Sequence, residues 1–189
     1  MDYIGVKAPQ FSFSRLHSAD PVLGVEMAST GEVGCLGESY YEAILSSMLS
    51  VGYTIPKKNI LLSAGTVRSK TELVNSVKML IENDYNVYTT GSTYEFLNNA
   101  GINTIRLYRP NENQSPTVLD YIKDKKLDLI INIPKELTQV ELEKDYLIRR
   151  NAVDGNIPLI TNARLASAFI HAFCKISIDE IAIKSWQEM

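Results

Sequence analysis

One short run of the chain, from Tyr88 to Thr93, concentrates hydroxyl groups around a glycine. An apolar strand pattern precedes the run and a helical pattern follows it, which predicts a strand-to-helix turn. Gly91 lets the backbone approach a ligand closely, and the amides of a helix start, with the hydroxyls of Thr90 and Thr93, favour a phosphate or carboxylate. An ordinary helix capped by Ser92 explains the same residues. The run by itself leaves an anion site and a plain helix cap both open.

Other residues suited to anion binding follow the remaining strand patterns. In an open parallel sheet, ligands bind beyond the carboxyl ends of the strands, so side chains at these ends are expected to meet. Three cations, one amide and a further hydroxyl occupy such places: Lys70, Arg109, Asn132, Lys135 and Thr138. A single surface cation is usually only solvated, whereas three at successive strand ends beside a hydroxyl-rich turn indicate a site for an anionic ligand.

Residues for catalysis are scarce. His17 and His171 have no acid or thiol at the spacing of metal ligands, and neither lies near a nucleophile in the sequence, so we expect no metal site and no nucleophile–base pair. Asp145 and Asp154 flank a helical pattern, where a charged, solvated helix face is the favoured interpretation. The residues therefore indicate binding and not chemistry.

Length and composition indicate a soluble globular protein. Its 189 residues are enough for one core, or for one domain with an appendage, and 45% of them are hydrophobic. A net charge of −3 argues against a nucleic-acid-coating surface, and no apolar run approaches the roughly 20 residues of a membrane span. Two distant cysteines, Cys35 and Cys174, favour a reducing, cytoplasm-like compartment. We expect neither a nucleic-acid nor a membrane partner.

The elements that must position the candidate residues become regular from residue 59. Five apolar strand patterns alternate there with helical segments, over residues 60–63, 86–89, 104–107, 127–133 and 158–161. Such alternation predicts an α/β fold, a five-stranded parallel sheet that is doubly wound in Rossmann-type layers. Residues 1–57 instead contain many glycines and prolines and one clear helical pattern. We expect a helix-and-loop segment with a linker over 1–57, and a domain over 58–189.

Two sets of motifs resemble a known family. Residues 7–13 (Lys-Ala-Pro-Gln-Phe-Ser-Phe), 19–24 (Ala-Asp-Pro-Val-Leu-Gly) and 26–33 (Glu-Met-Ala-Ser-Thr-Gly-Glu-Val) closely resemble the end of the carbamoyl-phosphate-forming half of the carbamoyl phosphate synthase large chain. Later residues resemble the methylglyoxal-synthase-like (MGS-like) regulatory domain that closes that large chain, with landmarks at 88–93, 131–134, 148–150 and 157–162. The resemblance covers nearly the whole sequence and implies that residues 1–57 are a remnant of an ATP-grasp domain.

The resemblance implies an allosteric role without catalysis in this chain. The parent enzyme is a ligase that makes carbamoyl phosphate from bicarbonate, two ATP and ammonia for pyrimidine and arginine synthesis, in the cytoplasm or the mitochondrial matrix. Its ATP and magnesium ligands would precede residue 1, so no cofactor is expected here. The implied partners are a small anionic effector, the rest of the large chain, a glutaminase small chain and further copies in a homo-oligomer.

The resemblance also implies roles for the candidate residues. In bacterial relatives the regulatory pocket holds the phosphate of UMP or IMP, and the residues that do so match Lys70, Thr90, Thr93 and Asn132. Relatives activated by N-acetylglutamate add a tryptophan and a second asparagine, whose positions match Arg109 and Lys135 here. Both replacements add positive charge, which favours a nucleotide-type effector over N-acetylglutamate.

Two alternatives stay open beside the regulatory function. Methylglyoxal synthase, a lyase acting on dihydroxyacetone phosphate, shares the fold and a similar Thr-Gly-x-Thr phosphate turn. Its acidic Gly-Gly-Asp loop is missing from the matching residues 111–116, which leaves that reaction without its general base. The chain could otherwise serve only as an interaction or oligomerisation module.

Overall fold

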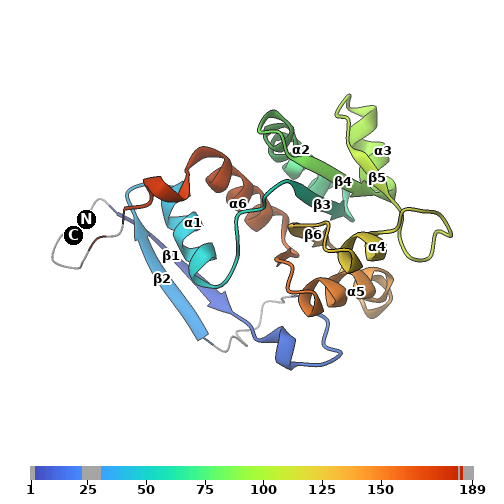
Figure 1. Ribbon diagram of the computed structural model, residues 1–189, viewed down its shortest axis with the longest axis horizontal. Helices are drawn as coiled ribbons and strands as arrows, with labels where there is room; N and C mark the ends of the chain where they lie inside the picture. Colours follow the sequence, from blue (N-terminus) through green and yellow to red (C-terminus); the bar gives the residue numbers. More distant parts are fainter. Residues whose placement is uncertain (1–2, 23–30, 183, 185–189) are drawn as a thin grey trace.

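The computed structural model describes residues 3–22, 31–182 and 184 (Figure 1). In chain order the elements are β1 (Ile4–Gln10), η1 (Phe13–Arg15), β2 (Gly31–Gly37), α1 (Tyr40–Ser50), β3 (Asn59–Ala64), α2 (Val67–Glu82), β4 (Asn86–Thr90), α3 (Gly91–Asn99), β5 (Ile105–Leu107), α4 (Val118–Lys123), β6 (Leu129–Ile133), α5 (Gln139–Asp154), β7 (Leu159–Ile160), α6 (Ala163–Lys175) and η2 (Ile178–Glu180). No helix within the described ranges is both long and apolar enough to cross a membrane.

Five strands form one parallel sheet in the order β5-β4-β3-β6-β7. β3 lies at its centre and pairs with β4 on one side and β6 on the other (Figure 1). All five residues of β6 are buried, as expected for an apolar strand that is covered on both faces. The predicted five-stranded parallel sheet is confirmed.

Helices cover both faces of the sheet, which confirms the doubly wound α/β fold. On one face, Leu62 of β3 and Ile131 of β6 pack in a core with residues of α1, α2, α3 and α6. On the other face, Leu61 and Ile130 pack with residues of α4 and α5. Successive residues of a strand point to opposite faces, so one continuous apolar run supplies both cores.

The segment before the sheet contains a β-hairpin that the sequence did not predict. β1 pairs antiparallel with β2 over its whole length, from Ile4 opposite Gly37 to Gln10 opposite Gly31. The predicted helix-and-loop composition of residues 1–57 is therefore wrong in this part. β2 reads Gly-Glu-Val-Gly-Cys-Leu-Gly, and glycines weaken a strand pattern because they have no side chain to pack. The pairing is also non-local, since residues 11–30 separate the two strands.

This N-terminal segment packs onto the main domain. Leu45 and Met48 of α1 share a core with Phe169 of α6, while Val6 of β1 packs against the same core.

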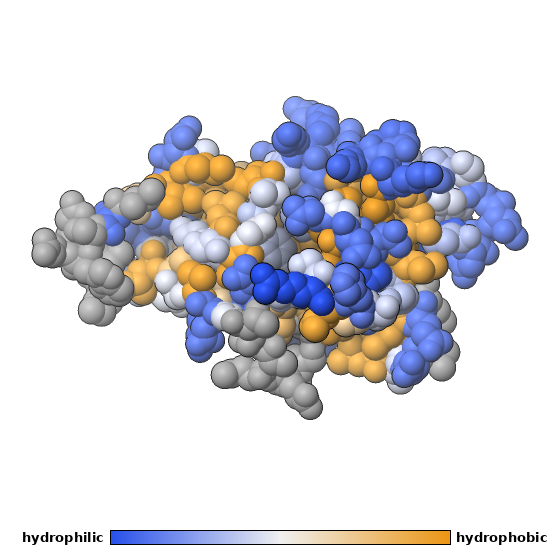
Figure 2. All heavy atoms as spheres, turned by 60° about the horizontal axis from the view of Figure 1, so that its bottom comes forward, coloured by the Kyte–Doolittle hydropathy of each residue, from blue (hydrophilic) through white to orange (hydrophobic). Residues whose placement is uncertain are grey.

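Apolar side chains also gather on the surface at the end of the molecule that holds β1, β2 and α1 (Figure 2). Exposed large apolar residues there are Ile4, Leu36 and Tyr40. The division at residues 57 and 58 stays a prediction.

Candidate functional site

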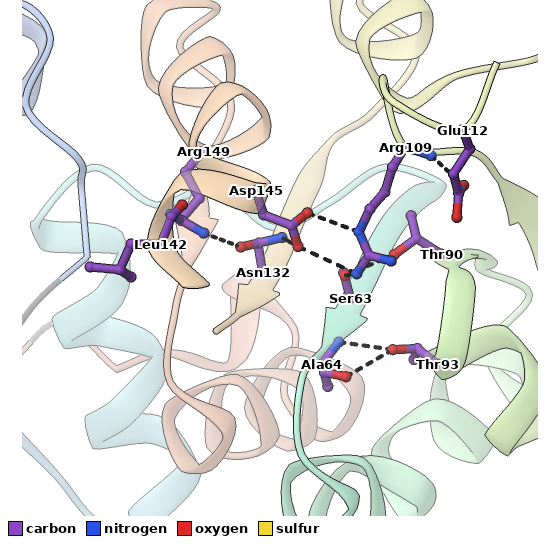
Figure 3. Close-up of polar contacts among 10 residues, drawn as sticks. All are labelled: Ser63, Ala64, Thr90, Thr93, Arg109, Glu112, Asn132, Leu142, Asp145 and Arg149. Carbon is purple, nitrogen blue, oxygen red and sulfur yellow. Dashed lines mark hydrogen bonds and ion pairs between the residues drawn. The ribbon is translucent and has the colours of Figure 1, made fainter. Parts of the chain in front are cut away.

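Polar side chains from three neighbouring strands meet at the carboxyl ends of the sheet. Ser63 of β3 lies opposite Asn132 of β6 in the strand register. Thr90 ends β4, and its hydroxyl donates to Ser63 Oγ at 2.8 Å. Arg109 follows β5 and reaches over these strand ends toward Asp145 of α5 (Figure 3). The parallel sheet thus brings together residues that are far apart in the sequence.

The hydroxyl-rich turn starts α3 two residues earlier than a cap at Ser92 would place it. The helix begins at Gly91, so the predicted cap at Ser92 is wrong, and Thr90 occupies the N-cap position without a side-chain capping bond. Ser92 Oγ instead accepts from Lys70 Nζ at 2.8 Å. Thr93 Oγ1 accepts from the Ala64 amide at 2.9 Å and donates to the Ala64 carbonyl at 3.1 Å. The Thr93 hydroxyl therefore fastens α3 to the end of β3.

Gly91 is required for the position of Arg109. Its φ of +44° lies in the left-handed region, where a side chain is strained. A Cβ built on Gly91 would lie 2.5 Å from Arg109 Nη1 and 3.8 Å from Glu112 Oε1. The guanidinium therefore lies directly against the backbone at the start of α3, where the helix amides favour negative charge.

Arg109 is paired with a carboxylate at this place. Its Nε donates to Asp145 Oδ1 at 2.9 Å, and its Nη2 is 3.5 Å from Asp145 Oδ2 and 3.3 Å from Ser63 Oγ. The Arg109 side chain is 25% exposed and that of Asp145 is 15% exposed. Glu112 Oε2 accepts from the Arg109 backbone amide at 2.7 Å.

Asn132 connects this ion pair to a second arginine. Its Nδ2 donates to Asp145 Oδ2 at 3.1 Å, and its Oδ1 accepts from Arg149 Nη1 at 2.9 Å. A carboxylate on one side and a guanidinium on the other fix the orientation of the amide. Arg149 is fully buried, and its Nε donates to Asp20 Oδ1 at 2.7 Å. A continuous polar network therefore runs from Arg109 to the N-terminal segment.

Arg150, next along α5, holds the same segment by its backbone. Its Nη1 donates to the carbonyls of Phe13, Leu16 and Ala19 at 3.0 to 3.2 Å. Its Nε donates to Asp154 at 3.0 Å. The Arg-Arg pair of α5 thus fastens residues 13–20 to the domain that carries the candidate site.

Lys70 adds a second positive charge beside Arg109. The residue is 6% exposed, and no carboxylate within the described part of the chain forms an ion pair with it. Burial lowers the pKa of Lys70 below its ordinary value, and the positive charge of Arg109 lowers it further, while Glu95 acts in the opposite direction. An anion near both cations would relieve this repulsion.

The candidate residues divide into two groups. Thr90, Gly91, Arg109 and Asn132 meet at the strand ends, with Lys70 and Thr93 joined to the same turn. Lys135 and Thr138 are exposed, and Thr138 occupies the N-cap of α5 without a side-chain capping bond. Sequence reasoning missed four members of the network, Asp20, Ser63, Asp145 and Arg149. The interpretation of Asp145 as part of a solvated helix face is wrong, because Arg109 and Asn132 hold it.

Two surface hollows lie elsewhere. One, of about 260 Å³, is lined mainly by residues of α1, α2 and α6, and another, of about 340 Å³, is lined by residues at the starts of α2 and α6. Thr90, Arg109 and Asn132 line neither of them. Among the residues that the structure describes, no three His, Cys, Asp or Glu side chains group closely enough to hold a metal ion.

Comparison with known proteins identifies relatives over most of the chain. Residues 72–161 match the family model of the MGS-like domain. The chain is 41% identical to the multifunctional protein ura1 of Schizosaccharomyces pombe over 92% of its length, and 42% identical to the multifunctional protein CAD of Squalus acanthias over 89%. It is 38% identical to the mitochondrial carbamoyl-phosphate synthase [ammonia] of Homo sapiens over 92%.

The chain spans only 8% of the length of the first two relatives and 12% of the third. A solved structure of methylglyoxal synthase from Elizabethkingia anophelis NUHP1 is also similar, with 19% identity and a TM-score of 0.46. That similarity covers 60% of this chain and 77% of the synthase chain.

Proposed function

This chain contains an MGS-like domain and is related to a segment of carbamoyl-phosphate synthases, and we propose that it is a regulatory segment that binds an anionic effector. The effector binds where β3, β4 and β6 end. The observation that carries the proposal is the guanidinium of Arg109, which lies against the Gly91 backbone at the start of α3 and beside Thr90 and Asn132. This set of a cation, helix amides and side-chain donors is what a phosphate or carboxylate requires.

The charges favour a phosphorylated effector of the UMP or IMP type over N-acetylglutamate. Lys70 and Arg109 are close enough for the charge of one to lower the pKa of the other. A phosphate carries up to two negative charges and can accept from both cations and from the amides of α3 at once. Each such charge-assisted hydrogen bond contributes about 1.5 to 3 kcal/mol. Lys135, exposed just after β6, extends the positive charge at this edge.

The effector acts on the rest of a larger enzyme through the N-terminal segment. The polar network runs from Arg109 through Asp145, Asn132 and Arg149 to Asp20. Coupling between an effector site and a distant site typically amounts to about 1 to 3 kcal/mol. In this proposal the parent protein makes carbamoyl phosphate for pyrimidine and arginine synthesis, and this segment tunes that reaction without carrying it out.

Calorimetric titration of the chain with UMP, IMP and N-acetylglutamate tests the proposal. We expect a nucleotide to bind in the micromolar to millimolar range, and Arg109→Gln to weaken it about tenfold or more because a charged contact is lost. Arg164→Gln is the matched control, since the Arg164 side chain is 78% exposed and lies outside the cluster. Absence of binding by all three compounds at millimolar concentration would refute the proposal.

A second set of measurements separates the alternative functions. Production of methylglyoxal from dihydroxyacetone phosphate would favour a lyase. Light scattering that shows self-association, combined with no heat of binding, would favour an oligomerisation module.

A further inference from the structure

We propose that the Asp145 carboxylate is an internal competitor of the effector: it holds the donors of Arg109 and Asn132 that the effector's anionic group requires, and the effector must displace it to bind. This inference rests on the proposed function of the site. It gives Asp145 of α5 a role in setting the apparent affinity for the effector. Neither the position of Asp145 in the helix nor its neighbours in the sequence connect it with a ligand.

The contacts of Asp145 are those that an anionic ligand would make. Oδ1 accepts from Arg109 Nε at 2.9 Å, and Oδ2 accepts from Asn132 Nδ2 at 3.1 Å (Figure 3). A phosphate or an effector carboxylate presents the same arrangement, two oxygens on one atom with negative charge shared between them. Figure 3 shows the carboxylate directed at both donors from the side of α5.

The geometry and exposure of the Arg109–Asp145 ion pair favour its exchange for a contact between Arg109 and a ligand. Only one of its two possible N–H···O contacts is short, because Arg109 Nη2 is 3.5 Å from Oδ2 and is shared with Ser63 Oγ at 3.3 Å. Both side chains also keep some exposure, 25% for Arg109 and 15% for Asp145. A paired carboxylate at the edge of solvent can turn outward and be hydrated there, which lowers the cost of its displacement.

The donors keep their directions when the carboxylate leaves. Asn132 is held from its other end by Arg149 Nη1 at 2.9 Å, so its Nδ2 continues to point at the site. Arg109 is confined by the bond of its backbone amide to Glu112 and by contact with the Gly91 backbone. An arriving anion therefore meets donors that are already oriented, and the displacement of Asp145 is the step that limits its affinity.

Competition of this kind has a quantitative signature. The apparent dissociation constant of any ligand is its intrinsic constant divided by the fraction of molecules in which the donors are free. Removal of the competitor therefore strengthens the binding of chemically different anions by a common factor. Removal of a residue that contacts the effector directly would instead weaken binding, and it would change the affinities for different anions by unequal factors.

The test compares Asp145→Asn with the wild-type chain, titrated calorimetrically with UMP and with inorganic phosphate. We expect Asp145→Asn to bind UMP and phosphate each about tenfold more tightly, or tighter still. A tenfold change in affinity corresponds to about 1.4 kcal/mol. Glu143→Gln is the matched control, because it removes one charge from an exposed position of the same helix, where Glu143 Oε1 accepts from Gln139 Nε2 at 3.2 Å. We expect this control to change each affinity less than twofold.

The outcomes separate this inference from the proposed function. Unchanged or weaker binding by Asp145→Asn, with binding by the wild type, overturns the competitor and leaves the function intact. Failure of the wild type and of every variant to bind either UMP or phosphate overturns the phosphorylated effector that the proposed function favours, and this inference with it. Asp145→Ser is a second variant that removes the carboxylate, and circular dichroism and thermal melting show whether each variant is folded. A folded Asp145→Ser that binds no more tightly than the wild type also overturns the inference.

Discussion

The bond between Arg149 and Asp20 offers the sharpest test of how the N-terminal segment is attached. Arg149 has no exposed side-chain surface, and its Nε and Nη2 donate to the two oxygens of Asp20 at 2.7 and 2.5 Å. Its Nη1 and Nη2 donate further to Asn132 and to the Leu142 carbonyl. Asp20→Asn keeps the shape of the partner but removes the only carboxylate that pairs with this buried cation among the described residues.

The magnitude follows from the burial of the cation. Removal of one partner from a buried ion pair costs about 3 to 5 kcal/mol, because the remaining charge is left uncompensated. The Asp20 side chain is 21% exposed, and water can therefore reach one side of the pair. The remaining bonds to Asn132 and Leu142 are also kept. We accordingly expect a loss near the lower end of that range, about 3 kcal/mol of unfolding free energy.

The neighbouring arginine supplies the matched control. Arg150 is also buried, with 8% exposure, but its partner Asp154 is 56% exposed, and water therefore reaches that ion pair. Asp154→Asn should accordingly lower stability less than Asp20→Asn. Urea unfolding of the wild type and both variants, followed by circular dichroism, measures the difference. Equal losses in the two variants would refute the reasoning that burial of the whole ion pair, cation and carboxylate together, determines the strength of the attachment.

Three further predictions concern the site and the core. Gly91→Ala should weaken phosphate binding about tenfold or more by displacing Arg109. Gly101→Ala is the control, because Gly101 also has a positive φ, +74°, but a Cβ added there has no atom within 4 Å and introduces only backbone strain. Equal affinities of the two variants in calorimetry would contradict this prediction. Lys70→Ala should weaken phosphate binding about tenfold. Because the pKa of Lys70 is lowered, wild-type affinity should begin to fall below pH 10.5 as the lysine loses its proton, and Lys70→Arg should abolish that fall in a pH series of titrations. Burial raises the pKa of Tyr53 from 10.0 to about 12, so this tyrosine ionises first in the unfolded chain. Its contribution to stability is full below pH 10 and decreases by about 1.4 kcal/mol per pH unit between the two values. Urea unfolding should find a smaller loss of stability over this range in Tyr53→Phe than in the wild type, and an unchanged slope would contradict the prediction.

The strands of the sheet could be predicted because their signal is local. The apolar run over 127–133 contains β6, and the pattern over 86–89 falls one residue short of the end of β4 at Thr90. Such runs are long enough to identify and are bounded by helical patterns. The hairpin of β1 and β2 carries no comparable signal. β2 is rich in glycine, and the two strands lie far apart in the chain, so they form only by pairing with each other.

The candidate site could be predicted in part for a similar reason. Thr90, Arg109 and Asn132 lie at strand ends, and the topology of a parallel sheet brings strand ends together. Asp145 could not be found in this way, because it lies within a helix and is separated from Arg109 by 36 positions. Helical periodicity describes which residues share a face, but it does not say which charged group of the helix faces a half-buried cation from another element.

By itself, the sequence determined the alternation of strands and helices from residue 59 onward, the resemblance to the MGS-like domain and the positively charged character of the strand ends. These features depend on residue type and on neighbours within a few positions. Only the tertiary structure decided that Arg109 is neutralised by Asp145, that Asn132 is oriented by Arg149, and that Arg149 in turn holds Asp20. Charge pairing depends on distance in space and on burial, and both arise only when separate elements pack together.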